Sequence, residues 1–106
     1  MSAADPRPVV NISVITPKVG KFDEFMALQL AQHRRLRGQV PGLVGGRLFR
    51  SRDNRTAVLV AVFETAEAAQ RFGQDERFLE HMARVRPLLE SAVPGTYDKV
   101  YEVGVV

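Results

Sequence analysis

The feature that most constrains the fold is a segment, Thr56 to Glu64, that is apolar on both of its alternating faces. Side chains along a β-strand point to opposite sides in turn, so Leu59 and Phe63 share one side and the three valines of the segment share the other. A strand without a polar face has to be covered twice. A chain of 106 residues forms one modest core only. We therefore expect its own helices to cover one face and a second copy of the chain to cover the other.

Three further segments have the patterns of strands. Leu43 to Ser51 precedes the apolar segment across the turn Arg52-Asp53-Asn54-Arg55, which predicts a hairpin. Val9 to Thr16 is bounded by two prolines and predicts the first strand. Pro94-Gly95 predicts a break, followed by a last strand over Tyr97 to Val105.

The helices are predicted between these strands. Gly20 opens a long helix that reaches about Arg37. Thr65 is an N-cap candidate for a helix over 66–72, and Asp75 is one for a further helix that Pro87 should kink or split. This order predicts an α+β fold of the ferredoxin-like split βαβ type, with an antiparallel sheet and helices on one face. Two copies pressing their sheets together would form a dimeric α+β barrel.

Polar side chains at two apolar positions are candidates for a site. Asn11 and Ser13 interrupt an apolar row of the first strand, and their partners are either a bound ligand or neighbouring backbone groups. Gln29 and His33 are predicted to fall one turn apart within the apolar face of the first helix. Either they line a cavity, with His33 exchanging protons near neutral pH, or they satisfy each other in the core.

Composition argues against several classes of protein. The chain has no cysteine and only two histidines, with no ligand spacing for a metal, so we expect no metal site and no cofactor. Its net charge of +3 is scattered, and the expected central strands hold one aromatic residue, Phe63, which argues against nucleic-acid binding. No apolar run reaches the length of a membrane span. We expect a cytoplasmic protein with a flexible arm at residues 1–8 and a single domain over 9–106.

Four motifs together resemble the antibiotic biosynthesis monooxygenase family. They are Val-Gly-Lys-Phe-Asp-Glu-Phe from Val19, Val-Pro-Gly-Leu-Val-Gly-Gly-Arg-Leu from Val40, Phe-Glu-Thr-Ala-Glu-Ala-Ala from Phe63 and Phe-Leu-Glu-His from Phe78. The resemblance spans about Pro8 to Val103. It implies a homodimeric α+β barrel with a small-molecule cavity between sheet and helices, and relatives that include cofactor-independent oxygenases of anthrones and quinols and haem-degrading enzymes.

Family site positions map onto this chain with substitutions. Where anthrone-oxidising members carry asparagine and tryptophan on the third strand, this chain has Leu59 and Phe63. Where haem-degrading members carry asparagine, tryptophan and an axial histidine, it has Asn11 or Ser13, then Phe72, then Met82 beside His81. A one-residue shift turns a helical side chain by about 100°, so haem degradation is the less favoured alternative.

The resemblance implies a cofactor-independent monooxygenase acting on a quinol, anthrone or similar aromatic metabolite in an apolar cavity. His33 or His81 would be the catalytic base, and Asn11, Ser13 and Gln29 would hold the substrate oxygen. The apolar walls would be Phe49, Leu59, Phe63, Phe72 and Met82. The alternative is a non-catalytic dimeric binder or stress-response protein with the same barrel.

Overall fold

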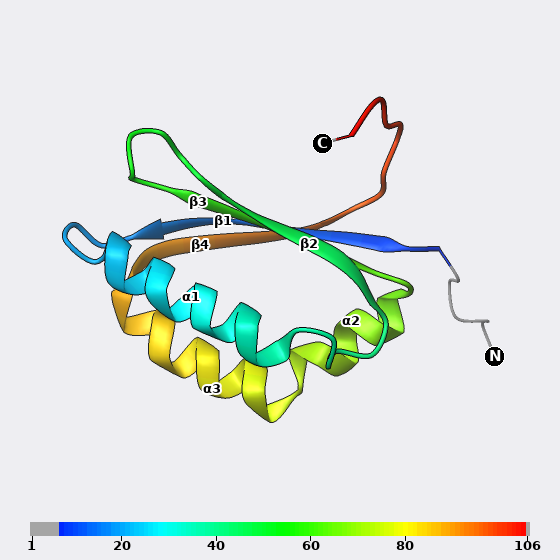
Figure 1. Cartoon of the computed structure of the whole chain (residues 1–106), viewed down its shortest axis with the longest axis horizontal. Helices are drawn as coiled ribbons and strands as arrows, with labels where there is room; N and C mark the ends of the chain where they lie inside the picture. The colour runs from blue at the N-terminus through cyan, green and yellow to red at the C-terminus, as the bar shows by residue number, and fades with distance from the viewer. Residues whose placement is uncertain (1–6, 106) are drawn as a thin grey trace.

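The computed structural model describes residues 7–105, so the arm predicted at residues 1–8 lies almost wholly outside the described residues. The elements follow the predicted order of strand, helix, hairpin, two helices and strand (Figure 1). They are β1 (Val9–Pro17), α1 (Phe22–Leu36), β2 (Leu43–Arg50), β3 (Ala57–Phe63), α2 (Ala66–Gly73), α3 (Glu76–Val85), the 3-10 turn η1 (Arg86–Leu88) and β4 (Leu89–Tyr97).

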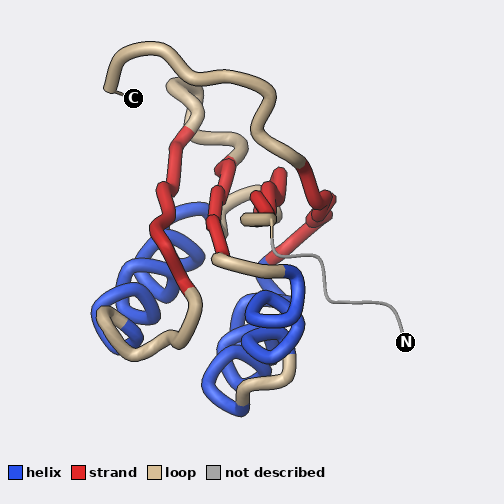
Figure 2. Tube along the Cα trace, turned by 90° about the vertical axis from the view of Figure 1, so that its right-hand side faces the viewer, coloured by secondary structure: helices blue, strands red, loops and turns tan. Residues whose placement is uncertain are grey.

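The four strands form one open antiparallel sheet in the order β2-β3-β1-β4. All three α-helices lie on the same side of it, as Figures 1 and 2 show from two directions. The predicted α+β, ferredoxin-like fold is therefore confirmed, with a sheet that does not close on itself within one chain.

Register explains how the apolar strand is covered. Asn11 pairs with Ala61, and Ser13 pairs with Leu59, so these side chains share the face that the helices cover. Ile12 pairs with Val60 on the opposite face, which we call the open face. Because the sheet has only one layer of helices, the β3 valines remain half-buried rather than buried.

The core lies between the sheet and the helices. Its buried members come from the two central strands, from α1 and α3, and from the turn that follows α3. They are Ile15, Ala57, Phe25, Val85 and Leu88. Leu48, Leu59 and Met82 pack against this cluster and are partly exposed. Leu59 and Met82 thus contribute to packing at positions where a ligand wall was predicted.

Local signals in the sequence account for the helix boundaries. The Ala68 backbone N–H donates to Thr65 Oγ1 at 3.1 Å, and the Arg77 backbone N–H donates to Asp75 Oδ1 at 2.8 Å, so both predicted N-caps are present. Pro87 lies in η1, where α3 has ended. At the start of β2 the register with β3 shifts between Leu43 and Gly45, which marks a bulge or irregularity just before the glycines Gly45 and Gly46.

The last strand was predicted wrongly at Tyr97 to Val105. β4 runs over Leu89–Tyr97 and contains the Pro94-Gly95 pair that was expected to break the chain. Pro94 pairs with Ser13 but β4 is an edge strand, where the missing N–H can face outward without costing a ladder bond. Residues 98–105 have no regular secondary structure and lie on the side of the sheet opposite the helices (Figure 1).

Candidate active site

A hollow of about 330 Å³ lies between α2 and the neighbouring strands β1 and β4. Its volume is at the lower end of the range of roughly 300–1,000 Å³ that is usual for small-molecule sites. The lining is mixed, with small apolar groups around three neutral polar side chains: Val9, Asn11, Ala66, Ala69, Gln70 and Thr96. A compact organic ligand with a few hydrogen-bonding groups suits this composition.

Asn11 and Thr96 form the polar centre of the hollow. They are paired across the β1–β4 ladder, and Thr96 Oγ1 donates a hydrogen bond to Asn11 Oδ1 at 3.2 Å. Within residues 7–105 this is the one hydrogen bond of the Asn11 side chain, so its Nδ2 group can still donate. The site therefore offers an oriented N–H donor to an oxygen atom of a ligand.

The prediction that His33 faces the sheet is wrong, because its side chain is exposed. The buried positions of α1 are Phe25, Gln32 and Leu36, and Gln29 is half-buried on the same stripe. His33 follows Gln32 and is turned about 100° away from it. The inward polar pair of the first helix is thus Gln29 and Gln32.

His81, by contrast, is buried between the helices, with 8% of its surface exposed. Its Nε2 atom lies 2.8 Å from Gln29 Oε1, so the neutral imidazole donates from Nε2 to the α1 amide. Burial, and secondarily the positive charge of Arg84, lower the pKa of His81 below its ordinary value. The Nε2 group of His81 is thus paired within the helix layer, and neither imidazole lines the 330 Å³ hollow.

The predicted aromatic walls separate into two groups. Phe49 pairs with Val58 and therefore lies on the open face, so its prediction as a cavity wall is wrong. Phe63 and Phe72 pack against each other with ring centroids 5.9 Å apart, and Phe72 lies 5.1 Å from Phe78. This cluster joins β3 to α2 and α3 and lies outside the lining of the hollow. Ser13 shares the covered face with Asn11 and is likewise absent from that lining.

Sequence reasoning missed Thr96 and Gln70. Thr96 could have been found only with the correct register of the last strand, since it faces Asn11 by virtue of the β1–β4 pairing. Gln70 lies on a short helix whose other lining residues are alanines, and no sequence signal marks it.

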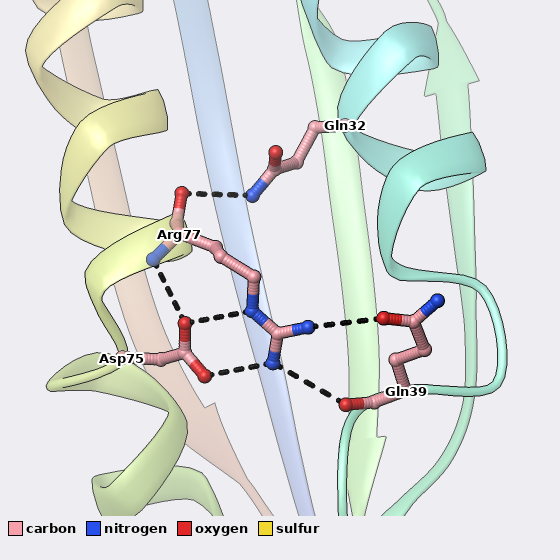
Figure 3. Close-up of polar contacts among 4 residues, drawn as sticks. All are labelled: Gln32, Gln39, Asp75 and Arg77. Atoms are coloured by element: carbon pink, nitrogen blue, oxygen red, sulfur yellow. Dashed lines mark hydrogen bonds and ion pairs between the residues drawn. The ribbon is translucent and has the colours of Figure 1, made fainter.

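A polar cluster at the junction of α2 and α3 connects these helices to the end of α1 (Figure 3). Arg77 donates from Nε and Nη2 to the two carboxylate oxygens of Asp75, at 3.0 and 2.8 Å. Its Nη2 also reaches the Gln39 carbonyl at 3.3 Å, and Gln32 Nε2 donates to the Arg77 carbonyl at 3.1 Å. Hydrogen bonds from Arg77 lower the pKa of Asp75 to about 2. The Asp75 carboxylate is paired with Arg77, and the cluster fixes α1 against α3.

Residues 7–105 contain no group of three or more histidine, aspartate or glutamate side chains arranged to hold a metal ion. Over the same range, no helix combines the length and the apolar character that crossing a membrane requires.

Comparison with solved structures supports the fold. SnoaB, a cofactor-independent oxygenase from Streptomyces nogalater, matches with a TM-score of 0.80 and 24% identity over 91% of this chain and 96% of its own. Rv0793 from Mycobacterium tuberculosis matches with a TM-score of 0.80 and 21% identity over 92% of this chain and 99% of its own. A protein from Shewanella oneidensis matches with a TM-score of 0.78 and 23% identity over 90% of this chain and 93% of its own.

Sequence comparison identifies the family. No functionally curated protein matches the chain. The family model described as antibiotic biosynthesis monooxygenase matches residues 8–95, which include every strand and helix except the last residues of β4. The chain therefore belongs to the antibiotic biosynthesis monooxygenase family.

Proposed function

We propose that this protein is a cofactor-independent monooxygenase that oxidises a small hydroxylated aromatic metabolite, an anthrone or a quinol, in the hollow between α2 and strands β1 and β4. The observation that carries the proposal is the free Asn11 Nδ2 donor in a hollow of about 330 Å³ on the helix-covered face of this family's sheet. The resemblance in fold to SnoaB, whose name describes a cofactor-independent oxygenase, supports the choice of reaction.

The chemistry requires an ionised substrate. A phenolate or the conjugate carbanion passes one electron to O₂, and the resulting radical and superoxide combine to a peroxide anion. This anion takes up a proton from water, which replaces the one lost when the substrate ionised, and becomes a hydroperoxide. Loss of water then leaves a carbonyl, so that one oxygen atom ends in the product and the other in water. Asn11 would donate to the substrate oxygen and stabilise its negative charge, with Thr96 holding the amide in position.

Within the described residues, the hollow contains no general base of its own. None of the side chains that line the hollow ionises near neutral pH. The substrate would therefore have to be acidic enough to ionise once its oxygen is hydrogen-bonded. The same observation favours the second candidate, a non-catalytic binder of the same class of aromatic ligand, because binding needs no base.

The assembly that we propose is a homodimer formed through the open face. Its exposed apolar side chains include Val14, Phe49, Val93 and Tyr97. The segment after β4 adds the exposed Tyr101 and Val103 on the same side of the sheet (Figure 1). Several exposed apolar side chains on one face are typical of an interface.

Oxygen consumption with a panel of anthrones and hydroquinones, without added flavin or metal, tests the proposal. We expect uptake by the native protein, and a decrease in kcat/KM of about tenfold or more in Asn11→Ala, which corresponds to about 1.4 kcal/mol of lost transition-state stabilisation. Asn54→Gly is the matched control, because it removes an amide from the hairpin turn, where Asn54 has φ of 59° that glycine also adopts. Its kcat/KM should be unchanged.

The two candidate functions give different results in this experiment. Saturable binding that depends on Asn11 but is not followed by oxygen uptake would identify the binder. Binding and turnover that are equal in Asn11→Ala and the native protein would contradict both, since the hollow would then have no part in either.

A further inference from the structure

A second, smaller hollow of about 70 Å³ lies between α1 and α3. It shares no lining residue with the first hollow. Its lining combines two apolar side chains with two guanidinium groups, one imidazole and one amide: Leu28, Ala31, Gln32, Arg35, His81 and Arg84. No carboxylate belongs to this set, so the charged groups of the lining are the two guanidinium groups.

The positive charge of this hollow is only partly compensated. Arg35 Nη1 lies 3.5 Å from Glu80 Oε2, and both side chains are about half exposed, so this ion pair is weak. Arg84 forms no ion pair within residues 7–105. Its charge also contributes, after burial, to the lowered pKa of His81, which indicates that the two side chains are close.

The inner wall of this hollow contains the side-chain amide of Gln32, which is held by a hydrogen bond. Gln32 is buried, and its Nε2 group donates to the Arg77 carbonyl at 3.1 Å (Figure 3). His81 is held in the same way from α1 by Gln29 Oε1. The polar groups on the inner wall are therefore held in place by α1–α3 contacts, while the two arginines stand at the more exposed rim.

Size restricts what this hollow can hold. A water molecule occupies roughly 30 Å³ in the liquid, so about 70 Å³ accommodates a group the size of a few waters. That is too small for an aromatic substrate, for which sites are several times larger. A compact anion with several oxygen atoms meets both the volume and the lining, because guanidinium groups bind oxyanions through paired N–H donors.

We propose that the hollow between α1 and α3 binds a small oxyanion, such as sulfate, phosphate or the carboxylate of a small organic acid, between Arg35 and Arg84 against the inner wall formed by Gln32 and His81. The site is separate from the proposed oxygenase hollow and does not depend on its function.

Binding at this site is linked to the protonation of His81. The groups that face the imidazole are Gln29, Gln32 and Arg35 from α1 and Arg84 from its own helix, with Glu80 paired to Arg35. An anion beside the ring favours the imidazolium form and raises the pKa of His81. By reciprocity, protonation of His81 strengthens anion binding as the pH falls.

The effect of an anion on the pKa of His81 can be measured by NMR, because the chain has only two histidines. The imidazole signals are followed in pH titrations with increasing sodium sulfate, against sodium chloride at equal ionic strength. Sulfate is chosen because its charge is constant over this range. We expect a saturable rise in the pKa of His81 that chloride does not produce. His33 is exposed on α1 and lies outside the hollow, so it serves as the internal reference and should respond equally to both salts.

Matched arginine variants separate the site from general charge effects. In Arg84→Gln the pKa of His81 should be higher without sulfate, because a repelling charge is gone, and the sulfate-dependent rise should decrease by at least severalfold. Arg35→Gln should also lose the sulfate-dependent rise. The controls, Arg34→Gln and Arg86→Gln, remove neighbouring arginines that do not line the hollow and should keep the native response.

The contradicting results are equally specific. Equal sulfate shifts for His33 and His81, or a native sulfate response in the Arg35→Gln, Arg84→Gln double variant, would overturn the proposal. Retention of the far-ultraviolet circular dichroism spectrum shows that each variant is folded. Repeating the titration with acetate and with phosphate identifies which oxyanion the site prefers.

Discussion

At the scale of single residues, the buried imidazole of His81 makes stability depend on pH. Its pKa is lowered in the folded protein from an ordinary value of 6.5, first by burial and then by Arg84. The unfolded chain therefore binds more protons than the folded one below about pH 6.5, and stability decreases as the pH falls through that region. Above about pH 6.5 the imidazole is neutral in both states, and the free energy of unfolding is not reduced by its protonation.

Replacing His81 by glutamine tests this dependence. Glutamine retains a hydrogen-bonding group opposite Gln29 and does not titrate. Between about pH 7.5 and 5.5 we expect the melting temperature of the native protein to fall more steeply than that of His81→Gln. His33 is exposed and present in both proteins, so it cancels in the comparison. Parallel pH profiles for the two proteins would show that His81 titrates in the same range whether the chain is folded or unfolded.

At the scale of elements, Gly42 lets the loop between α1 and β2 pass close to α2. Gly42 has φ of 80°, and a Cβ atom there would lie 2.5 Å from the Ala68 Cβ of α2. The Glu64 backbone N–H donates to the Gly42 carbonyl at 2.7 Å, so this loop also joins the end of β3. Gly20 has the same φ of 80° with no atom within 4 Å of such a Cβ.

The two glycines form a matched pair. Gly20→Ala should lower the free energy of unfolding by about 1 kcal/mol, the cost of a left-handed backbone for alanine. Gly42→Ala should cost about 1–3 kcal/mol more, because the new methyl group overlaps Ala68. Chemical denaturation measures both. Adding Ala68→Gly should recover part of the additional loss in Gly42→Ala and none in Gly20→Ala. Equal losses in the two single variants would show that the contact with Ala68 is not limiting.

Elements whose signals are local could be predicted from the sequence. The caps at Thr65 and Asp75, the end of α3 before Pro87 and the hairpin around Asp53 each rest on residues close in sequence. The strand β4 could not be predicted in this way. Proline is tolerated within a strand mainly at a sheet edge, and the position of β4 at the edge follows from the tertiary arrangement. That error concealed Thr96, and with it half of the polar centre beside Asn11.

Helix phase set a second limit. The apolar residues of α1 are compatible with neighbouring phases, and the inward stripe of Phe25, Gln29, Gln32 and Leu36 is fixed only when α3 packs against it. Gln32 then takes the place that the sequence assigned to His33. An error of one residue in the helix phase therefore changes which polar residue is predicted to face inward.

At the scale of the whole molecule, the open face is the surface through which we propose that two copies associate. Helices cover one side of the sheet, and the β3 valines with their neighbours on β1, β2 and β4 remain accessible on the other. The segment 98–105 that follows β4 lies on this accessible side as well (Figure 1). The two hollows lie among the helices and at the α2 end of the covered face, so a partner on the open face would leave both accessible.

The variant Val60→Glu tests this assembly, because Val60 pairs with Ile12 and Arg47 in the central part of the open face. In a single chain the half-buried position lets a carboxylate reach water, so the fold should survive. In a dimer joined through this face the carboxylate would be removed from water with the cross-strand Arg47 as its neighbouring cation. The desolvation cost of such a buried pair exceeds its Coulombic gain unless the geometry is excellent, so the dimer should be weakened. Analytical ultracentrifugation should therefore find a dimer of the native protein and a monomer of Val60→Glu. Val19→Glu introduces the same charge at a fully exposed loop position, 100% accessible, and should remain dimeric. A native protein that sediments as a monomer, or a Val60→Glu dimer of undiminished affinity, would show that the valines of β3 are covered in some other way.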